Sequence, residues 1–73
     1  MVENYDVVVR FEKGQKFIAN IRSRIIPRIG EFVNLEDNDE VMAQYGEAYF
    51  QIVGVEYEYN IDGELDVVWL NVK

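Results

Sequence analysis

Hydrophobic and polar residues alternate along most of the chain, with an apolar spacing of two. This spacing, with abundant Val, Ile, Tyr and Phe, is typical of β-strands and not of helices. It predicts five strands: Tyr5–Phe11, Gln15–Ile26, Phe32–Leu35, Ala48–Tyr59 and Leu65–Val72. One short helical turn is expected near residues 39–45, where Asn38 or Asp39 can cap it and Gly46 can stop it.

The segment Glu12-Lys13-Gly14 predicts the turn between the first two strands. A three-residue loop with Gly14 in the left-handed region sets Val9 opposite Phe17 and puts both apolar sets on one face. A two-residue turn is disfavoured, because it sets Arg10 against Phe17 and mixes the faces. The other face then carries a basic ridge with two aliphatic residues: Asp6, Val8, Arg10, Lys16, Ile18, Asn20, Arg22 and Arg24.

Two glycine-containing sites shape the remaining strands. Pro27 and Gly30 break the second strand, because proline lacks the amide proton that a ladder needs. Gly54 lies in the middle of the longest strand, where glycine indicates a bulge or a sharp bend. Such a bend allows a small sheet to curl.

The pair Asp62-Gly63 favours a two-residue turn in the closing hairpin. That turn sets Tyr57 opposite Val68 and Glu56 opposite Trp69. A three-residue loop is the alternative, and it is less favoured because it sets Glu58 against Asp66, two like charges.

Five short antiparallel strands with one bent strand predict an all-β fold, a small closed or partly open barrel. A chain of 73 residues has room for a single domain, spanning residues 1–73.

The segment Ile26-Pro27-Arg28-Ile29-Gly30-Glu31-Phe32-Val33 resembles the Pro-Arg-x-Gly-(Asp/Glu)-x-(Val/Ile) segment of small SH3-like β-barrel proteins of bacteria and mobile elements. Residues 50–57, the Asp62-Gly63 hairpin and residues 67–70 look like the later strands of such barrels. The resemblance implies a five-stranded antiparallel SH3-like barrel and brings no catalytic residue with it. Function therefore has to be argued from surface residues.

The composition argues against an enzyme. The chain contains no His, no Cys and no Thr, and its single serine, Ser23, has no imidazole to activate it. Without Cys there is no disulfide and no thiolate metal site. We therefore expect no catalytic residue, no cofactor and no metal.

The charge is distributed unevenly along the chain. Fourteen acidic against seven basic residues give a net charge of −7. The first thirty residues carry six basic and three acidic residues (+3), whereas residues 31–73 carry eleven acidic residues and Lys73 (−10). This predicts a basic first hairpin beside an acidic loop, residues 36–40, and an acidic closing hairpin.

Carboxylates are hard oxygen ligands, so residues 36–40 and 58–63 are candidate Ca²⁺ or Mg²⁺ sites. Neither spacing matches an EF-hand loop, because position twelve counted from Glu58 is Trp69. A hairpin turn accounts for residues 60–63 without a metal. Catalysis by a carboxylate pair is also disfavoured, because so small a barrel offers little cleft in which to desolvate one.

Another protein is the expected partner. Trp69 falls on the non-core face of the closing hairpin, and amphipathic rings are frequent at interfaces. The predicted partner-binding residues are Trp69, Tyr57, Glu56, Glu58, Asp37 and Asp39. Homodimerisation is the alternative form of the same hypothesis, because a small domain without disulfides gains stability from burying a surface against its twin.

Two nucleic-acid hypotheses remain as alternatives. The carboxylates could mimic phosphates and block a nucleic-acid-binding protein. Direct binding would use basic residues, namely Arg10, Lys16, Arg22, Arg24 and Arg28, but a net charge of −7 makes it weak and dependent on salt. The start of the chain lacks a basic, apolar signal sequence, and no apolar run reaches bilayer length, so we expect a cytoplasmic protein without membrane contact.

Overall fold

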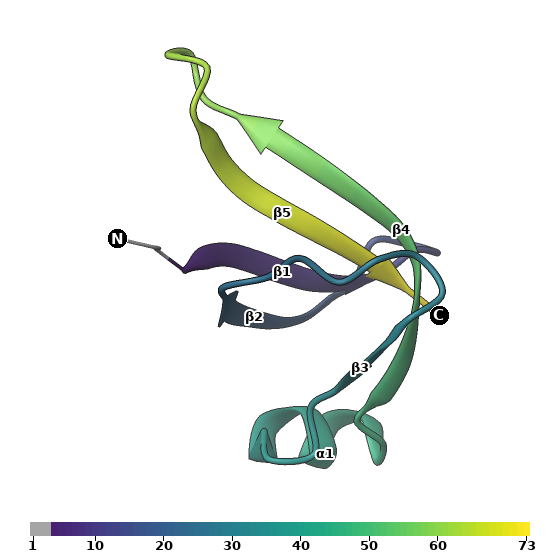
Figure 1. The fold of residues 1–73 in the computed structure, drawn as a ribbon. Helices are drawn as coiled ribbons and strands as arrows, with labels where there is room; N and C mark the ends of the chain where they lie inside the picture. Colours follow the sequence, from purple (N-terminus) through teal and green to yellow (C-terminus); the bar gives the residue numbers. More distant parts are fainter. Residues whose placement is uncertain (1–3) are drawn as a thin grey trace.

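The computed structural model describes residues 4–73. Five strands and one short helix follow one another along these residues (Figure 1). They are β1 (Tyr5–Phe11), β2 (Phe17–Ser23), β3 (Phe32–Asn34), α1 (Asp39–Tyr45), β4 (Tyr49–Tyr59) and β5 (Leu65–Val72). The strands form one sheet in the order β2-β1-β5-β4-β3. The predicted five-stranded all-β fold with one helical turn is confirmed.

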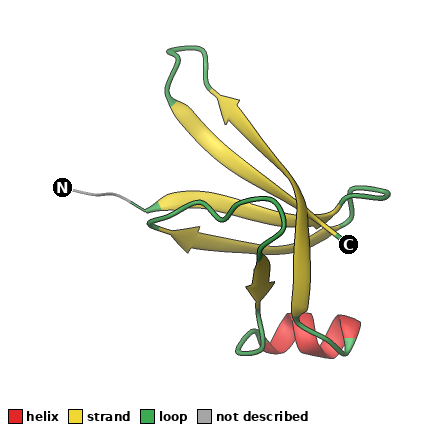
Figure 2. Cartoon of the chain, turned by 45° about the vertical axis from the view of Figure 1, so that its right-hand side comes forward, coloured by secondary structure: helices red, strands yellow, loops and turns green. Residues whose placement is uncertain are grey.

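The sheet curls into a half-barrel because β4 belongs to two pairings (Figure 2). Residues 49–51 of β4 pair with β3, and its later residues pair with β5. The register shifts between Ile52 and Gly54, so Val53 is a bulge at the point where β4 changes partner. The predicted bend at Gly54 is confirmed. The edge strands β2 and β3 do not pair with each other, so the barrel stays partly open.

The pairing of β1 with β5 is parallel, with Val7 beside Val68 and Phe11 beside Val72. The prediction of a wholly antiparallel sheet is wrong for this pair and correct for the other three pairs. A hairpin turn makes the two strands it joins antiparallel, but no turn joins β1 to β5. Turn residues therefore carry no information on their relative direction.

The β1–β2 hairpin is displaced by two residues from the predicted register. Val9 lies opposite Ala19 and not opposite Phe17. The turn contains four residues, because Gln15 (φ 51°) follows Gly14 (φ 80°) in the left-handed region. A left-handed backbone is uncommon for Gln, so the sequence predicted a left-handed residue only at Gly14. The predicted three-residue loop is therefore wrong.

A bulge at Ile18 reverses the faces of β2 next to this turn. Ala19 pairs with Val9 and Phe17 pairs with Arg10, which leaves Ile18 as the extra residue. Ile18 and Ala19 are both buried, whereas Phe17 is 57% exposed. A bulge can direct two consecutive side chains to the same side of the sheet. The prediction that Phe17 is core and Ile18 is surface is wrong for this reason.

The favoured two-residue turn at Asp62-Gly63 is wrong, although the strand register predicted with it holds for residues 55–58. Tyr57 lies opposite Val68 and Glu56 opposite Trp69, as predicted. Near the tip, however, the Asn60 N–H donates to the Glu64 carbonyl, which makes a three-residue loop. Asp66 is an extra residue on β5, so the register shifts by one residue between this loop and the rest of the hairpin. Glu58 therefore lies opposite Val67 and not opposite the like charge of Asp66.

Helix α1 begins and ends at the predicted residues. The Asn38 Oδ1 atom accepts a hydrogen bond from the Val41 N–H at 3.1 Å. Gly46 adopts φ 71°, and its N–H donates to the Met42 carbonyl at 2.9 Å. Among residues 4–73 no helix is long and apolar enough to cross a membrane.

Thirteen buried apolar residues form the core on the concave side of the sheet. They are Val7, Val9, Ile18, Ala19, Val33, Leu35, Val41, Ala48, Phe50, Ile52, Val68, Leu70 and Val72. Tyr45 covers the core next to the β1–β2 turn. Its ring makes edge contacts with Phe11 and Phe50, and its hydroxyl donates to the Phe17 carbonyl at 2.9 Å.

The reversed faces of β2 predict a stability difference between two neighbouring positions. Ile18→Ala should lower the free energy of unfolding by about 2–4 kcal/mol, because it leaves a cavity in the core. Phe17→Ala should change it by less than about 1 kcal/mol, because that ring is mostly in water. Urea denaturation of both variants measures the two values. A larger loss for Phe17→Ala would show that the bulge is absent.

Candidate functional site

Four side chains from three strands meet on the outer, convex face of the sheet. They are Arg10 from β1, Trp69 and Asn71 from β5, and Glu56 from β4, and we refer to them as the Arg10 cluster. The Arg10 Nε donates to Asn71 Oδ1 at 2.7 Å, and its Nη2 donates to Glu56 Oε2 at 2.7 Å. The Asn71 Nδ2 also donates to Glu56 Oε2, at 2.8 Å. The guanidinium carbon lies 4.3 Å from the centroid of the Trp69 ring.

The strand registers bring these residues together. The parallel pairing sets Arg10 beside Asn71, and the antiparallel pairing sets Glu56 opposite Trp69. Gly54 lies opposite Asn71, and a Cβ added to Gly54 would lie 3.3 Å from the Asn71 Nδ2. The missing side chain at Gly54 therefore leaves the space that Asn71 occupies.

Within residues 4–73, Asn71 is the buried polar residue of the fold. A buried amide is costly unless its polar atoms are paired. Its oxygen accepts from Arg10 and its nitrogen donates to Glu56, so both are satisfied. Asn71 thus fixes the positions of the two charged groups on either side of it.

The cluster keeps Glu56 ionised. The hydrogen bond from Asn71 and then that from Arg10 lower the pKa of the Glu56 carboxyl below its ordinary value, against a smaller opposing effect of desolvation. The Arg10 side chain is only 14% exposed, because Trp69, Asn71 and Glu56 surround it. Its guanidinium therefore bonds to groups within the protein and is not accessible to a phosphate.

The β4–β5 hairpin projects beyond the rest of the sheet as an arm (Figure 1). Tyr57 is 51% and Tyr59 is 60% exposed. Both alternate with Glu56 and Glu58, so they lie on the opposite side of the arm. Tyr5 of β1 is also exposed and shares their side by register, because Val7 and Tyr57 both align with Val68. We refer to Tyr5, Tyr57 and Tyr59 as the tyrosine face.

The structure divides the predicted partner-binding residues among three places. Trp69, Glu56 and Glu58 lie together on the outer face of β4 and β5. Tyr57 lies on the opposite side of the same arm. The remaining two, Asp37 and Asp39, lie beside α1, at the end of the molecule away from the arm (Figure 1).

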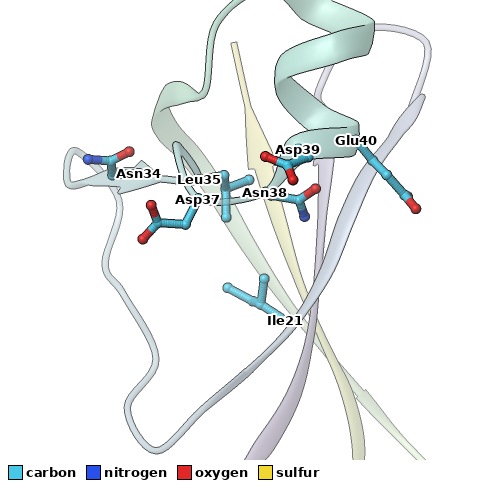
Figure 3. Close-up of a pocket in the computed structure, with 7 residues that line it drawn as sticks. All are labelled: Ile21, Asn34, Leu35, Asp37, Asn38, Asp39 and Glu40. Carbon is cyan, nitrogen blue, oxygen red and sulfur yellow. The ribbon is translucent and has the colours of Figure 1, made fainter.

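Asp37 and Asp39 line a hollow between β2 and the start of α1 (Figure 3). Its lining residues are Ile21, Asn34, Leu35, Asp37, Asn38, Asp39 and Glu40. The part of the chain that the structure describes holds no group of three or more acidic side chains placed to hold a metal ion. Other acidic residues lie on the arm, on β1 (Asp6), in the β1–β2 turn (Glu12) and before β3 (Glu31), so they do not gather on one face.

Three of the five basic residues considered for nucleic acid are engaged by other side chains. Arg10 belongs to the cluster, and Arg22 forms an ion pair with Asp6 at 3.3 Å. The Lys16 ammonium lies 5.6 Å from the centroid of the Tyr45 ring. Arg24 and Arg28 are exposed in the segment that joins β2 to β3. The predicted basic ridge is therefore interrupted.

One further surface was missed by sequence reasoning. The rings of Phe32 and Tyr49 stack in parallel, with centroids 4.9 Å apart, and they are 51% and 57% exposed. Ile25 and Ile29 are also exposed, and we refer to these four residues as the β3 patch. The exposure of Phe32 and Tyr49 could have been predicted from the sequence, because each alternates with a buried residue, Val33 or Phe50. The role of Asn71 could not have been predicted, because its contact with Arg10 requires the parallel pairing of β1 with β5.

No protein-family model matches the chain, and no curated protein or solved structure shows significant similarity to it.

The Arg10 cluster predicts a pH dependence. The pKa of Glu56 is lower in the folded protein than in the unfolded chain, where it is near 4.5. Ionised Glu56 therefore stabilises the fold at pH values above 4.5, and this stabilisation is lost as the pH falls through the folded pKa. In Asn71→Ala the Glu56 pKa should rise towards the ordinary value, because the hydrogen bond that lowers it most is removed. Carboxyl NMR titration of both proteins measures this difference. An unchanged Glu56 pKa would show that Asn71 does not hold the carboxylate.

Proposed function

We propose that the protein is a non-enzymatic interaction module that binds another protein through its β4–β5 arm. The tyrosine face is the observation that supports this proposal. Tyr57 and Tyr59 expose more than half of their surface on an arm that projects from the body. Tyrosine offers a large apolar ring with a polar tip, and it is enriched where proteins bind one another.

The outer side of the arm supports a partner that carries basic groups. Glu56 and Glu58 stand beside Trp69 on this side, and Glu64 and Asp66 follow towards the tip. The Trp69 ring is held in place by Arg10, so little freedom remains to be lost on binding. A partner that contacts both sides of the arm would bind the tyrosine face on one side and the carboxylates of Glu56 and Glu58 on the other.

The proposal extends to the class of protein. The curled half-barrel is compatible with an SH3-like barrel, and the resemblance in residues 26–33 supports a bacterial or mobile-element protein of the cytoplasm. Fold likeness does not define a ligand, so the arm and not the barrel supports the binding proposal. The nucleic-acid alternatives have less support, because the acidic residues are spread over several elements and Arg10 is enclosed.

Removing the two arm tyrosines should weaken partner binding without unfolding the protein. Tyr57→Ser with Tyr59→Ser should weaken the affinity at least about tenfold, because truncating an interface anchor commonly costs about 2 kcal/mol. Affinity capture from the native host, followed by calorimetry with the purified partner, measures the change. Phe17→Ser is the matched control, because it removes an equally exposed aromatic ring that lies away from both the arm and β3.

Equal loss of affinity in the Phe17→Ser control, or full affinity in the arm variant, would contradict the proposed binding surface. Circular dichroism of each variant separates loss of binding from loss of fold.

A further inference from the structure

We propose that two copies of the chain associate through the open edge of β3, with their β3 strands antiparallel across a two-fold axis. This inference goes beyond the proposed function, because it concerns a different surface and a second copy of the same chain. It rests on the backbone of β3, on the β3 patch and on the charges before and after this strand.

The backbone of β3 has groups that its neighbour β4 does not use. The Ile52 N–H donates to the Glu31 carbonyl, and the Leu35 N–H donates to the Ala48 carbonyl. Odd-numbered residues of this segment therefore direct their backbone groups to β4. In an antiparallel ladder the alternate residues direct theirs the other way, so those of Phe32 and Asn34 point to the open edge.

The open edge of β3 is complementary to itself. A two-fold axis at Val33 sets Phe32 of one copy opposite Asn34 of the second copy, and the reverse. Each such pair exchanges two N–H to carbonyl hydrogen bonds, which satisfies all four outward groups of each strand. In an isologous interface each contact occurs twice, with the roles of the two copies exchanged. The β3 edge can make such paired contacts without any rearrangement of the sheet.

The β3 patch would be covered by the same pairing. Phe32 and Tyr49 stack on the outer face, and diagonal neighbours across paired strands lie within reach of aromatic rings. The two stacked pairs would thus form one group of four rings. Exposed Ile25 lines the same hollow as Phe32 and Tyr49 and extends the apolar surface beside the rings. Contiguous exposed apolar surface of this type is characteristic of association sites.

The charges select a second copy in the antiparallel direction. The segment before β3 carries Arg24, Arg28 and Glu31, a net charge of +1, and the segment after it, residues 36–40, carries four acidic residues. Antiparallel pairing sets the basic side of one copy against the acidic side of the other, twice per dimer. The two salt bridges within residues 4–73 join Arg10 to Glu56 and Arg22 to Asp6, so neither consumes these charges.

The other open edge, β2, does not have this complementarity. Arg22 lies on it and Arg24 follows it directly. A two-fold axis at Asn20, the middle of β2, would set Arg24 of one copy opposite Lys16 of the second copy, twice per dimer. Exposed cationic residues are a common protection of edge strands against pairing. Of the two edges, β3 is therefore the one suited to self-association.

Charge reversal with exchange tests the proposal. Sedimentation equilibrium of the wild-type chain should show a dimer. Arg24→Glu with Arg28→Glu should weaken self-association at least about tenfold, and so should Glu36→Lys with Asp37→Lys, because each double variant sets like charges together twice. An equimolar mixture of the two double variants should restore the dimer, because every contact then joins opposite charges.

Two controls keep the test decisive. Tyr57→Ser with Tyr59→Ser should remain dimeric, so failure of the arm proposal and failure of the dimer proposal give different results. Circular dichroism should show that both charge variants are folded. A wild-type chain that is monomeric at about 1 mM would overturn the inference, since that concentration lies far above the dissociation constant of a specific dimer. A dimer unaffected by either charge reversal would overturn it equally.

Discussion

The bend of β4 at Val53 and Gly54 is the constraint on which the rest of the structure depends. At this bend β4 passes from its pairing with β3, through residues 49–51, to its pairing with β5, from Ile52 onward, so the sheet curls and encloses Phe50 and Ile52. The same glycine leaves space for Asn71, which holds Arg10 and Glu56 in fixed positions. The core and the outer cluster are therefore two consequences of one local distortion, one on each face of the sheet.

The bend also determines which surfaces remain open. Because β3 follows the first part of β4 away from β2, the two edges do not meet and β3 keeps an unpaired side. The later part of β4 extends with β5 into the arm that carries Tyr57 and Tyr59. The two proposed interaction surfaces thus lie at different ends of β4. A dimer formed through β3 would leave both arms accessible, and two linked binding sites can raise overall affinity without any new contact.

The sequence analysis predicted the features that depend on local chemistry. Asn38 and Gly46 delimit α1, and Gly54 marks the bend, because capping and backbone freedom are properties of single residues. It failed where the outcome depends on distant strands. The bulge that buries Ile18 arises from fitting β2 to β1, and Asn71 reaches Arg10 only through the parallel β1–β5 pair. Of the predicted site, Trp69, Glu56 and Glu58 were placed together correctly, because one hairpin register decides all three.

Hydrogen exchange at the backbone of β3 tests the account most directly. The Val33 amide, directed towards β4, should be protected at every protein concentration. The amides of Phe32 and Asn34 should exchange freely at about 5 µM and become protected at about 1 mM, as a second copy occupies the edge. Protection of Phe32 and Asn34 that does not change with concentration would contradict the account, because it would mean that the edge is closed within one chain. Free exchange of both at the higher concentration would contradict it as well.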